Sequence, residues 1–422
     1  MRSLARLAAL TLAGCLLSGC GTVSAANFKT VVHTAQHTLH QITKTPASTA
    51  SLHWINEPET GISPWLRAIA QAHHTIEVND YLLTDSRLIQ ALRQAAHRGV
   101  TVQVIIDGKP YGDASAVRQT RAAFAGSRVQ LKSAPARFEG TYAYDHAKYL
   151  VVDPGTSHGL AILGSANGTA SAFTGYNLED DVETTAPSVV GALHQVFTAD
   201  WQNRIAGLAP RGTLVLSPGA EPQLLALLAS PGPVAVMTEE LGSAQSMYAA
   251  LMTHRSAARV LVPASLSTEG RIYATALAAA GVQIRTLQSP YVHAKLIVTK
   301  TRTFVGSQNF SVVSFNDNRE VGLITRAASI HGQALAWFNA EWTRATPWGQ
   351  TPPPTSSGAS GSSSGTLPYL PDGDTMAQVQ ALWGKPASIS HDVYRGTPET
   401  VWHYSIGTVY FEHGLVSYVQ RS

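Results

Sequence analysis

The sequence predicts an α/β protein made of two similar halves, followed by a small α+β unit at the C-terminus. Two observations support this prediction. Short apolar runs alternate with stretches of helical periodicity, first over residues 51–208 and again over 209–347. A His-x-Lys motif also occurs once in each half, and its histidines, His146 and His293, are 147 residues apart, about the length of one domain. We therefore expect an internal duplication.

In the first half, the spacing of apolar residues predicts strands that alternate with helices. Asp85 is a good N-cap for a helix that carries Leu88 and Leu92 on one face. The run Val102–Ile106 is apolar except for Gln103, as is typical of a buried parallel strand. We predict helices at Pro64–Ala72, Asp85–His97 and Ala114–Ala125, and strands at Thr75–Val78, Val102–Ile106 and Val129–Leu131.

The second half repeats this plan. The predicted strands are Leu214–Leu216, Val234–Met237, Val260–Val262 and Val282–Arg285, and the predicted helices are Glu221–Leu228, Ala244–Ala257, Gly270–Ala280 and Ser329–Ala345. The last of these helices has a counterpart in the first half at Ala192–Trp201. The order of elements is thus the same in both halves.

The overall charge does not indicate a nucleic-acid partner. Charged residues make up 14% of the chain and the net charge is +3, too small for binding by bulk electrostatics. The two cysteines, Cys15 and Cys20, both lie in the first twenty residues. Disulfides and cysteine-based metal sites or nucleophiles are therefore excluded from the rest of the chain.

The N-terminus has the pattern of an export signal. Residues 1–20 combine two arginines with a short apolar run, and Leu17-Ser18-Gly19-Cys20 resembles a bacterial lipobox, in which Cys20 becomes lipidated. An alternative is an ordinary signal peptide cleaved after Ala26. We expect residues 21–50 to be a tether and Cys20 to anchor an exported protein in the cell envelope. Gly21 follows the cysteine, which favours the outer membrane, facing the periplasm.

The C-terminal region reads as a linker and a third unit. Residues 348–366 are rich in Pro, Ser and Gly, which predicts a flexible linker. Residues 367–422 then form a small unit, with a predicted helix that ends at Leu382 and strands at Ala387–Tyr394, Thr400–Ser405, Val409–Glu412 and Leu415–Gln420.

Each His-x-Lys motif is followed by the same two polar motifs in the same order. The first copy contains His146, Lys148 and Asp153, then Gly164-Ser165-Ala166-Asn167 and Asn177-Leu178-Glu179; the second contains His293 and Lys295, then Gly306-Ser307-Gln308-Asn309 and Asn318-Arg319-Glu320. One His-x-Lys is weak evidence of function, but two copies with the same companions are hard to obtain by chance. We interpret them as two halves of one site.

These residue types suit chemistry on a phosphodiester. Lysine is a compact cation for a phosphate oxygen, and serine and asparagine side chains add hydrogen-bond donors. Glu179 could accept a hydrogen bond from one ring nitrogen of His146 and so orient the ring. If the halves face each other, one histidine can attack phosphorus while the other protonates the leaving oxygen.

The repeated pattern H-x-K-x₄-D, with G-S-x-N and Glu downstream, resembles the phospholipase D superfamily over about residues 51–346. The resemblance implies two phospholipase D-like α-β-α halves related by a pseudo-twofold axis, with the site between them. It also implies a phosphohistidine intermediate, no metal and no cofactor. Its catalytic residues are His146, His293, Lys148, Lys295, Asp153, Glu179 and Glu320, and its phosphate-binding residues are the two lysines with Ser165, Asn167, Ser307 and Asn309.

The second motif departs from the family pattern. Lys300 stands where the first copy has Asp153, and we interpret it as part of a solvated loop. In most family members the first histidine is the nucleophile, so the resemblance assigns that role to His146.

Residues 367–422 resemble the small SmpA/OmlA-type outer-membrane lipoprotein domain. The resemblance rests on Gly384-Lys385-Pro386, Trp402-His403-Tyr404 and Val409–Gly414. It implies a module that binds an envelope protein partner. A stabilising appendage without a partner is the alternative.

We therefore expect a lipid-anchored phosphodiesterase that hydrolyses or transfers phosphatidyl groups of a phospholipid substrate at the membrane. Two alternatives stay open. One is a nuclease of the same superfamily, although nucleic acid is the less favoured substrate, because such nucleases usually pair two chains with one motif each. The other is a non-catalytic envelope scaffold that binds lipid or protein.

Overall fold

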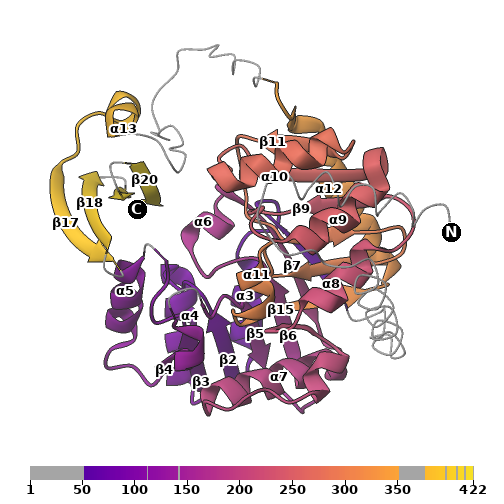
Figure 1. Cartoon of the computed structure of the whole chain (residues 1–422). Coiled ribbons are helices and arrows are strands. Elements are labelled where there is room, and N and C mark those ends of the chain that lie inside the picture. The colour runs from indigo at the N-terminus through magenta and orange to yellow at the C-terminus, as the bar shows by residue number, and fades with distance from the viewer. Residues whose placement is uncertain are drawn as a thin grey trace.

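The computed structural model describes residues 52–111, 113–140, 143–350, 376–394, 397–404, 407–412 and 415–421 (Figure 1). Predictions for the export signal at 1–20, Cys20, the tether at 21–50 and nearly all of the linker at 348–366 lie outside these residues. The described chain forms two eight-stranded sheets and one four-stranded sheet. No helix in this described part is long and apolar enough to cross a membrane.

The first half is a mixed sheet with the strand order β1-β7-β6-β5-β2-β3-β4, in which β2, β3 and β4 run parallel. The strands are β1 (Leu52–Glu57), β2 (Thr75–Asp80), β3 (Thr101–Ile106), β4 (Gln130–Ser133), β5 (Tyr149–Val152), β6 (Leu160–Gly164) and β7 (Asn177–Thr184). The helices are α3 (Ser63–Gln71), α4 (Ser86–His97), α5 (Ala114–Phe124), α6 (Ala170–Phe173) and α7 (Pro187–Trp201), with the short helix η2 (Ala136–Phe138).

The second half has the corresponding order β16-β11-β10-β9-β13-β14-β15-β8. Its strands are β8 (Val215–Ser217), β9 (Val234–Met237), β10 (Ala258–Pro263), β11 (Gln283–Leu287), β13 (Leu296–Val298), β14 (Thr303–Gly306), β15 (Glu320–Thr325) and β16 (Thr346–Pro347), while β12 (Tyr291–Val292) pairs with β7. Its helices are η3 (Ala209–Gly212), α8 (Glu221–Leu228), α9 (Gln245–His254), η4 (Arg255–Ala257), α10 (Thr268–Ala279), α11 (Val312–Asn316) and α12 (Ala328–Arg344). The predicted fold of two similar α/β halves is confirmed.

Local sequence explains why these elements form. Asp85 caps α4 and accepts hydrogen bonds from the backbone nitrogens of Arg87 and Leu88, a contact that stabilises a helix by about 1 kcal/mol. The central strand β5 is buried along its whole length. Its side chains alternate between two cores, because Leu150 packs with α3 and α4 while Tyr149 packs toward the second half.

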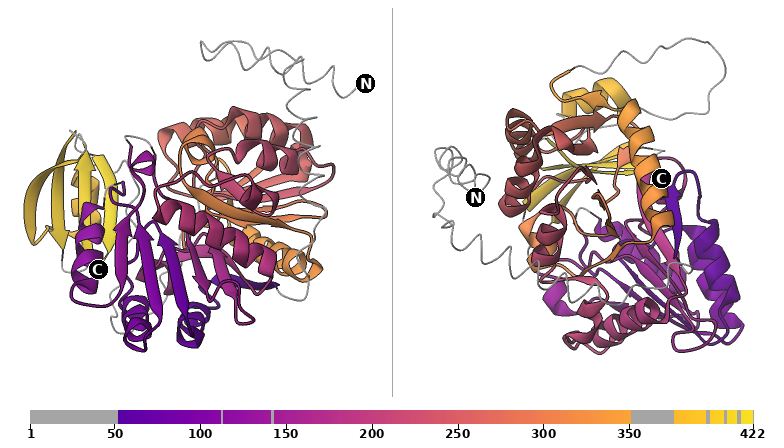
Figure 2. Two further views of the ribbon diagram at one scale, coloured as in Figure 1. Left: turned by 90° about the horizontal axis from the view of Figure 1, so that it is seen from below. Right: turned by 90° about the vertical axis from the view of Figure 1, so that its right-hand side faces the viewer.

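The two halves share one apolar core. Helices α7 and α12 lie between the sheets, and Phe197 and Phe338 are fully buried there with residues of both sheets (Figure 2). Full burial of one such ring contributes about 2 kcal/mol. Trp54 of β1 meets Trp337 of α12 with ring centres 5.8 Å apart. The site between the halves is therefore held by an extensive interface.

The C-terminal unit consists of α13 (Met376–Trp383) and an antiparallel sheet of β17 (Ser388–Tyr394), β18 (Thr397–Tyr404), β19 (Gly407–Glu412) and β20 (Leu415–Arg421). It has a small core of its own, in which Trp402 packs against Phe411. In both figures this yellow unit lies beside the first half, near α5. The predicted helix and four strands are confirmed.

Candidate active site

The first histidine and lysine lie directly before β5, at the edge that faces the second half. The backbone nitrogen of His146 donates to the carbonyl of Arg319, 2.9 Å away in the other half. Tyr81, which follows β2, covers both side chains: its ring centre lies 4.8 Å from that of His146 and 5.2 Å from Lys148 Nζ. The first half thus presents its histidine and lysine against an aromatic ring.

The second histidine and lysine lie between β12 and β13. The backbone nitrogen of His293 donates to Leu178 in β7, and that of Lys295 donates to the Asp180 side chain at 2.9 Å. Both contacts cross from one half to the other. The halves therefore hold each other's His-x-Lys segments by backbone hydrogen bonds.

Each histidine pairs with the glutamate of the opposite half. His146 Nδ1 lies 3.0 Å from Glu320, and His293 Nδ1 lies 2.6 Å from Glu179. The prediction that Glu179 orients His146 within its own half is wrong, because β7 and β15 each direct their glutamate across the interface. Since Nδ1 faces a carboxylate in both rings, the carboxylate favours a proton on that nitrogen and directs Nε2 away from the glutamate.

A set of polar side chains holds the two glutamates, which are fully buried. Asn177 and Ser165 donate to Glu179, and Asn318 and Ser314 donate to Glu320, at 2.7–3.0 Å. The first asparagine of each N-x-E motif was not assigned a role from the sequence, although its repetition was a usable signal. These contacts fix the orientation of each carboxylate toward its histidine.

The two predicted phosphate-binding serines have their hydroxyls engaged elsewhere. Ser165 Oγ donates to Glu179, and Ser307 Oγ donates to the carbonyl of Val321 at 3.3 Å. In this structure the two hydroxyls therefore hold neighbouring groups of the site, and neither is directed to a phosphate as predicted. Asn167 and Asn309 are buried near the site, and their Oδ1 atoms have no hydrogen-bond partner within the described residues.

Asp153 lies at the opposite end of β5 from His146, so the structure places it outside the cluster with which it was grouped as catalytic. Its carboxylate accepts three hydrogen bonds of 2.7 Å from the backbone nitrogens of His73, His74 and Thr75. It therefore ties the loop before β2 to the end of β5. Lys300, at the matching position, is exposed, in agreement with a solvated loop.

Glu239 was not predicted from the sequence, yet it contacts three residues of the second motif. Its Oε2 lies 2.8 Å from Lys295 Nζ, 3.3 Å from Asn309 Nδ2 and 3.5 Å from His293 Nε2. It stands two residues after β9, at the carboxyl edge of the sheet, where ligand sites of open α/β sheets usually lie. The position of Glu239 just after a predicted strand was therefore the one sequence signal that could have indicated a role in the site.

Burial and charge set the protonation of the site. Burial lowers the pKa of His146 to about 4, although the charge of Glu320 acts in the opposite direction. Burial also lowers the pKa of Lys148 to about 8. Against its burial, Glu320 has a lowered pKa because His146 and Lys148 favour its ionised form. At neutral pH, His146 is therefore an uncharged imidazole beside a carboxylate.

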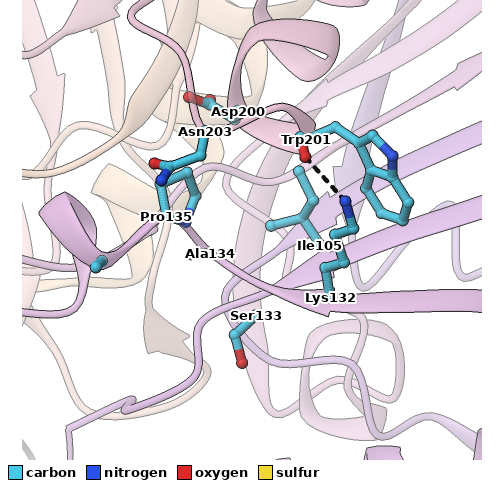
Figure 3. Close-up of a pocket in the computed structure, with 9 residues that line it drawn as sticks. Ile105, Lys132, Ser133, Ala134, Pro135, Asp200, Trp201 and Asn203 are labelled. Carbon is cyan, nitrogen blue, oxygen red and sulfur yellow. Dashed lines mark hydrogen bonds between the residues drawn. The ribbon is translucent and has the colours of Figure 1, made fainter.

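A pocket of about 250 Å³ is lined by residues outside the two motifs (Figure 3). Its lining includes Lys132, Asp200 and Trp201, and Lys132 Nζ donates to the carbonyl of Trp201 at 3.1 Å. Neither histidine and neither motif lysine lines it. In the described ranges there is no group of three or more His, Cys, Asp or Glu side chains that could hold a metal ion.

Comparisons with known proteins identify a family and similar folds. The family model described as cardiolipin synthase, PLD-like domain, matches residues 65–201 and 234–342, more than half of the chain. Phosphatidylserine synthase from Haemophilus influenzae Rd KW20 is similar in structure, with a TM-score of 0.58 and 11% identity over 75% of this chain and 91% of that one. Polyphosphate kinase from Porphyromonas gingivalis has a TM-score of 0.53 and 14% identity over 69% of this chain.

The match spans half the length of that kinase. A search of curated proteins found no match. At such low identities the structural likeness shows the fold, whereas the family match extends over both halves and both histidine motifs. The chain therefore belongs to the PLD-like domain family, whose members are phosphodiesterase-type enzymes.

Proposed function

We propose that this protein is a phospholipase D-type phosphodiesterase that hydrolyses or transfers phosphatidyl groups through a phosphohistidine intermediate. The observation that carries the proposal is the crossed pairing of His146 with Glu320 and of His293 with Glu179. It orients two histidines from two halves toward one interface, beside Lys148 and Lys295. This is the arrangement that a two-step displacement at phosphorus requires.

In the first step, Nε2 of His146 attacks phosphorus and the bond to the leaving oxygen breaks. A protonated His293 gives its Nε2 proton to that oxygen, so the alcohol leaves neutral. His146 suits the nucleophile because burial lowers its pKa to about 4 and keeps its ring uncharged. His293 is assigned the acid because carboxylates lie close to both of its ring nitrogens, 2.6 Å from Nδ1 and 3.5 Å from Nε2.

In the second step, water or an acceptor alcohol attacks phosphorus and the N–P bond to His146 breaks. His293 takes the proton of the attacking hydroxyl and returns to its starting state. The two lysines, with Asn167 and Asn309, hold the phosphate oxygens, where the negative charge of the transition state develops. Hydrolysis and transfer differ only in the hydroxyl that enters.

The proposed substrate is a phospholipid, because the matching family is that of cardiolipin synthase and the similar structure from Haemophilus influenzae is a phosphatidylserine synthase. The proposed location is the cell envelope, with Cys20 as lipid anchor in the outer membrane facing the periplasm. The lipobox-like residues before Cys20 support this. The C-terminal unit is proposed to be an SmpA/OmlA-like module that binds an envelope protein.

The test compares substrates with purified full-length chain in detergent. Phospholipid vesicles, single-stranded DNA and a chromogenic phosphodiester are each assayed with and without chelator, with His146→Ala and His293→Ala as matched variants. We expect phospholipid turnover that resists the chelator and is lost in both variants. Preferential cleavage of DNA would establish the nuclease alternative. Turnover of no substrate, or activity that survives both substitutions, would refute the enzyme and leave the scaffold.

A further inference from the structure

The second half of the site contains an anion of its own. Glu239 Oε2 lies within 3.5 Å of the nitrogens of His293, Lys295 and Asn309, of which Lys295 and Asn309 were predicted to bind phosphate. Its other oxygen, Oε1, accepts a hydrogen bond from the Tyr291 hydroxyl at 3.1 Å. The side chain is 23% exposed, so a ligand that enters the site can reach it.

The first half has no such anion at the equivalent position. Asn79 pairs with Tyr149, the residue after Lys148, and Met237 pairs with Leu296, the residue after Lys295. Two residues further along, Tyr81 and Glu239 therefore occupy equivalent places. Tyr81 offers Lys148 and His146 the face and edge of a ring, and within the described ranges Lys148 forms no ion pair.

The carboxylate of Glu239, in place of the ring of Tyr81, changes the charge that surrounds a bound phosphate. The Glu239 carboxylate already lies 2.8 Å from Lys295 Nζ, the cation proposed to hold a phosphate oxygen in this half. Although burial opposes it, the charges of His293 and Lys295 hold the pKa of Glu239 well below its ordinary value, so it is ionised. A phosphodiester that takes Lys295 therefore leaves the ionised Glu239 carboxylate without that cation.

We propose that Glu239 is a specificity-determining residue, which favours phosphodiesters with an ammonium group on the alcohol next to phosphorus over diesters that carry only negative charge. The ammonium group balances the negative charge of the phosphate, so the substrate is neutral as a whole. It also gives the Glu239 carboxylate a cation to pair with when Lys295 binds the phosphate. This inference rests on the proposed function, because it concerns the alcohol side of the same phosphodiester.

The experiment compares dihexanoyl phosphatidylethanolamine with dihexanoyl phosphatidylglycerol, both below their micelle concentrations so that surface charge plays no part. Full-length wild type, Glu239→Gln, Glu239→Asp and the adjacent control Glu240→Gln are assayed. We expect wild type to prefer the ethanolamine lipid in kcat/KM. Glu239→Gln should reduce that preference about tenfold, mainly through KM, because one charge contact is lost. Glu239→Asp and Glu240→Gln should keep the preference.

The outcomes separate this inference from the proposed reaction. An unchanged ratio in Glu239→Gln, or an equal loss with both lipids, would overturn it, since the carboxylate would then act only on its histidine and lysine. Binding of both lipids is also measured by calorimetry in His146→Asn, alone and with Glu239→Gln. This arm needs no turnover, so it decides the inference even if wild type hydrolyses neither lipid. Absence of an ethanolamine preference in binding would likewise overturn it.

Discussion

The two halves of the site share a backbone plan but differ in the groups around their histidines. In the first half, Tyr81 covers His146 and Lys148 with an aromatic ring. In the second, Glu239 places a carboxylate against His293 and Lys295. One histidine is thereby kept neutral and the other is flanked by negative charge. The two halves thus carry similar histidines in unequal surroundings, which fits the different roles proposed for them.

The residues that precede the two glutamates also differ in how they join the halves. Arg319 precedes Glu320 as Leu178 precedes Glu179, but Leu178 is an apolar core residue while Arg319 forms a buried ion pair with Asp200 at 2.7 Å. Asp200 also binds Arg137 at 2.6 Å. The second half is thus fastened to the first by a charged network on one side and by apolar packing on the other.

The largest expected effect separates the two histidines. His146→Ala and His293→Ala should each lower kcat/KM by about 10³-fold or more, since each removes an obligatory chemical group. With a substrate whose leaving group is good, the first step needs no acid. His293→Ala should then accumulate a phosphorylated enzyme, whereas His146→Ala should not. Mass spectrometry of the trapped protein should place the phosphate on the peptide that contains His146. Phosphate on the His293 peptide in His146→Ala would reverse the roles.

The charged side of the interface should dominate the stability. Asp200→Ala leaves Arg319 buried without its partner, and we expect the free energy of unfolding in urea to fall by about 3–5 kcal/mol. Arg67→Ala is the control, because Arg67 is an exposed residue 4.0 Å from Glu183, and its loss should change stability by under about 0.5 kcal/mol. Similar values for both variants would contradict the buried network.

Substitution of the two crossed carboxylates should have the next largest effect. Glu320→Gln and Glu179→Gln keep the shape but remove the charge that orients each histidine, and each should lower kcat/KM by about 10²-fold. A double-mutant cycle on kcat/KM should show strong coupling between Glu320 and His146 but little between Glu179 and His146. The reverse result would restore the pairing within each half.

The acid limb of the pH profile reports on the first histidine. Because burial lowers the pKa of His146 to about 4, the ring is uncharged above that pH and becomes protonated as the pH falls through it. The acid limb of kcat/KM should therefore lie near pH 4, below the ordinary histidine value of about 6.5. In Glu320→Gln the limb should move lower, since the carboxylate that favours the charged ring is gone. A limb near the ordinary value in wild type would contradict this environment.

The smallest effects concern the last position of each motif. Asp153→Asn removes charged acceptors from three backbone nitrogens and should cost about 1–2 kcal/mol of unfolding free energy, with kcat/KM within about threefold of wild type. Lys300→Asp should change neither quantity appreciably, because the side chain is exposed. A large loss of activity without loss of stability in Asp153→Asn would return this residue to the catalytic group.

The sequence alone was enough to predict two α/β halves, both His-x-Lys pairs and the strands of the C-terminal unit. These features depend on periodicity and on short motifs, which lie within a few residues of each other in the chain. The N-x-E motifs also pointed to the two glutamates. What the motifs did not contain was the partner of each glutamate, because a motif repeated in both halves fits pairing within a half as well as pairing across it.

The tertiary structure decided which groups face each other. Strand β7 carries Glu179, Asp180 and Asp181, a run of acids that composition alone would place at the surface, yet all three are buried. Glu179 and Asp180 contact the second half, and Asp181 accepts a hydrogen bond from the backbone of Ala166 in its own half. Glu239 and Tyr81 reach the site because two strand ends meet there from opposite halves. Contacts between residues more than a hundred positions apart arise only when the chain folds, and they turned two equal motifs into one asymmetric site.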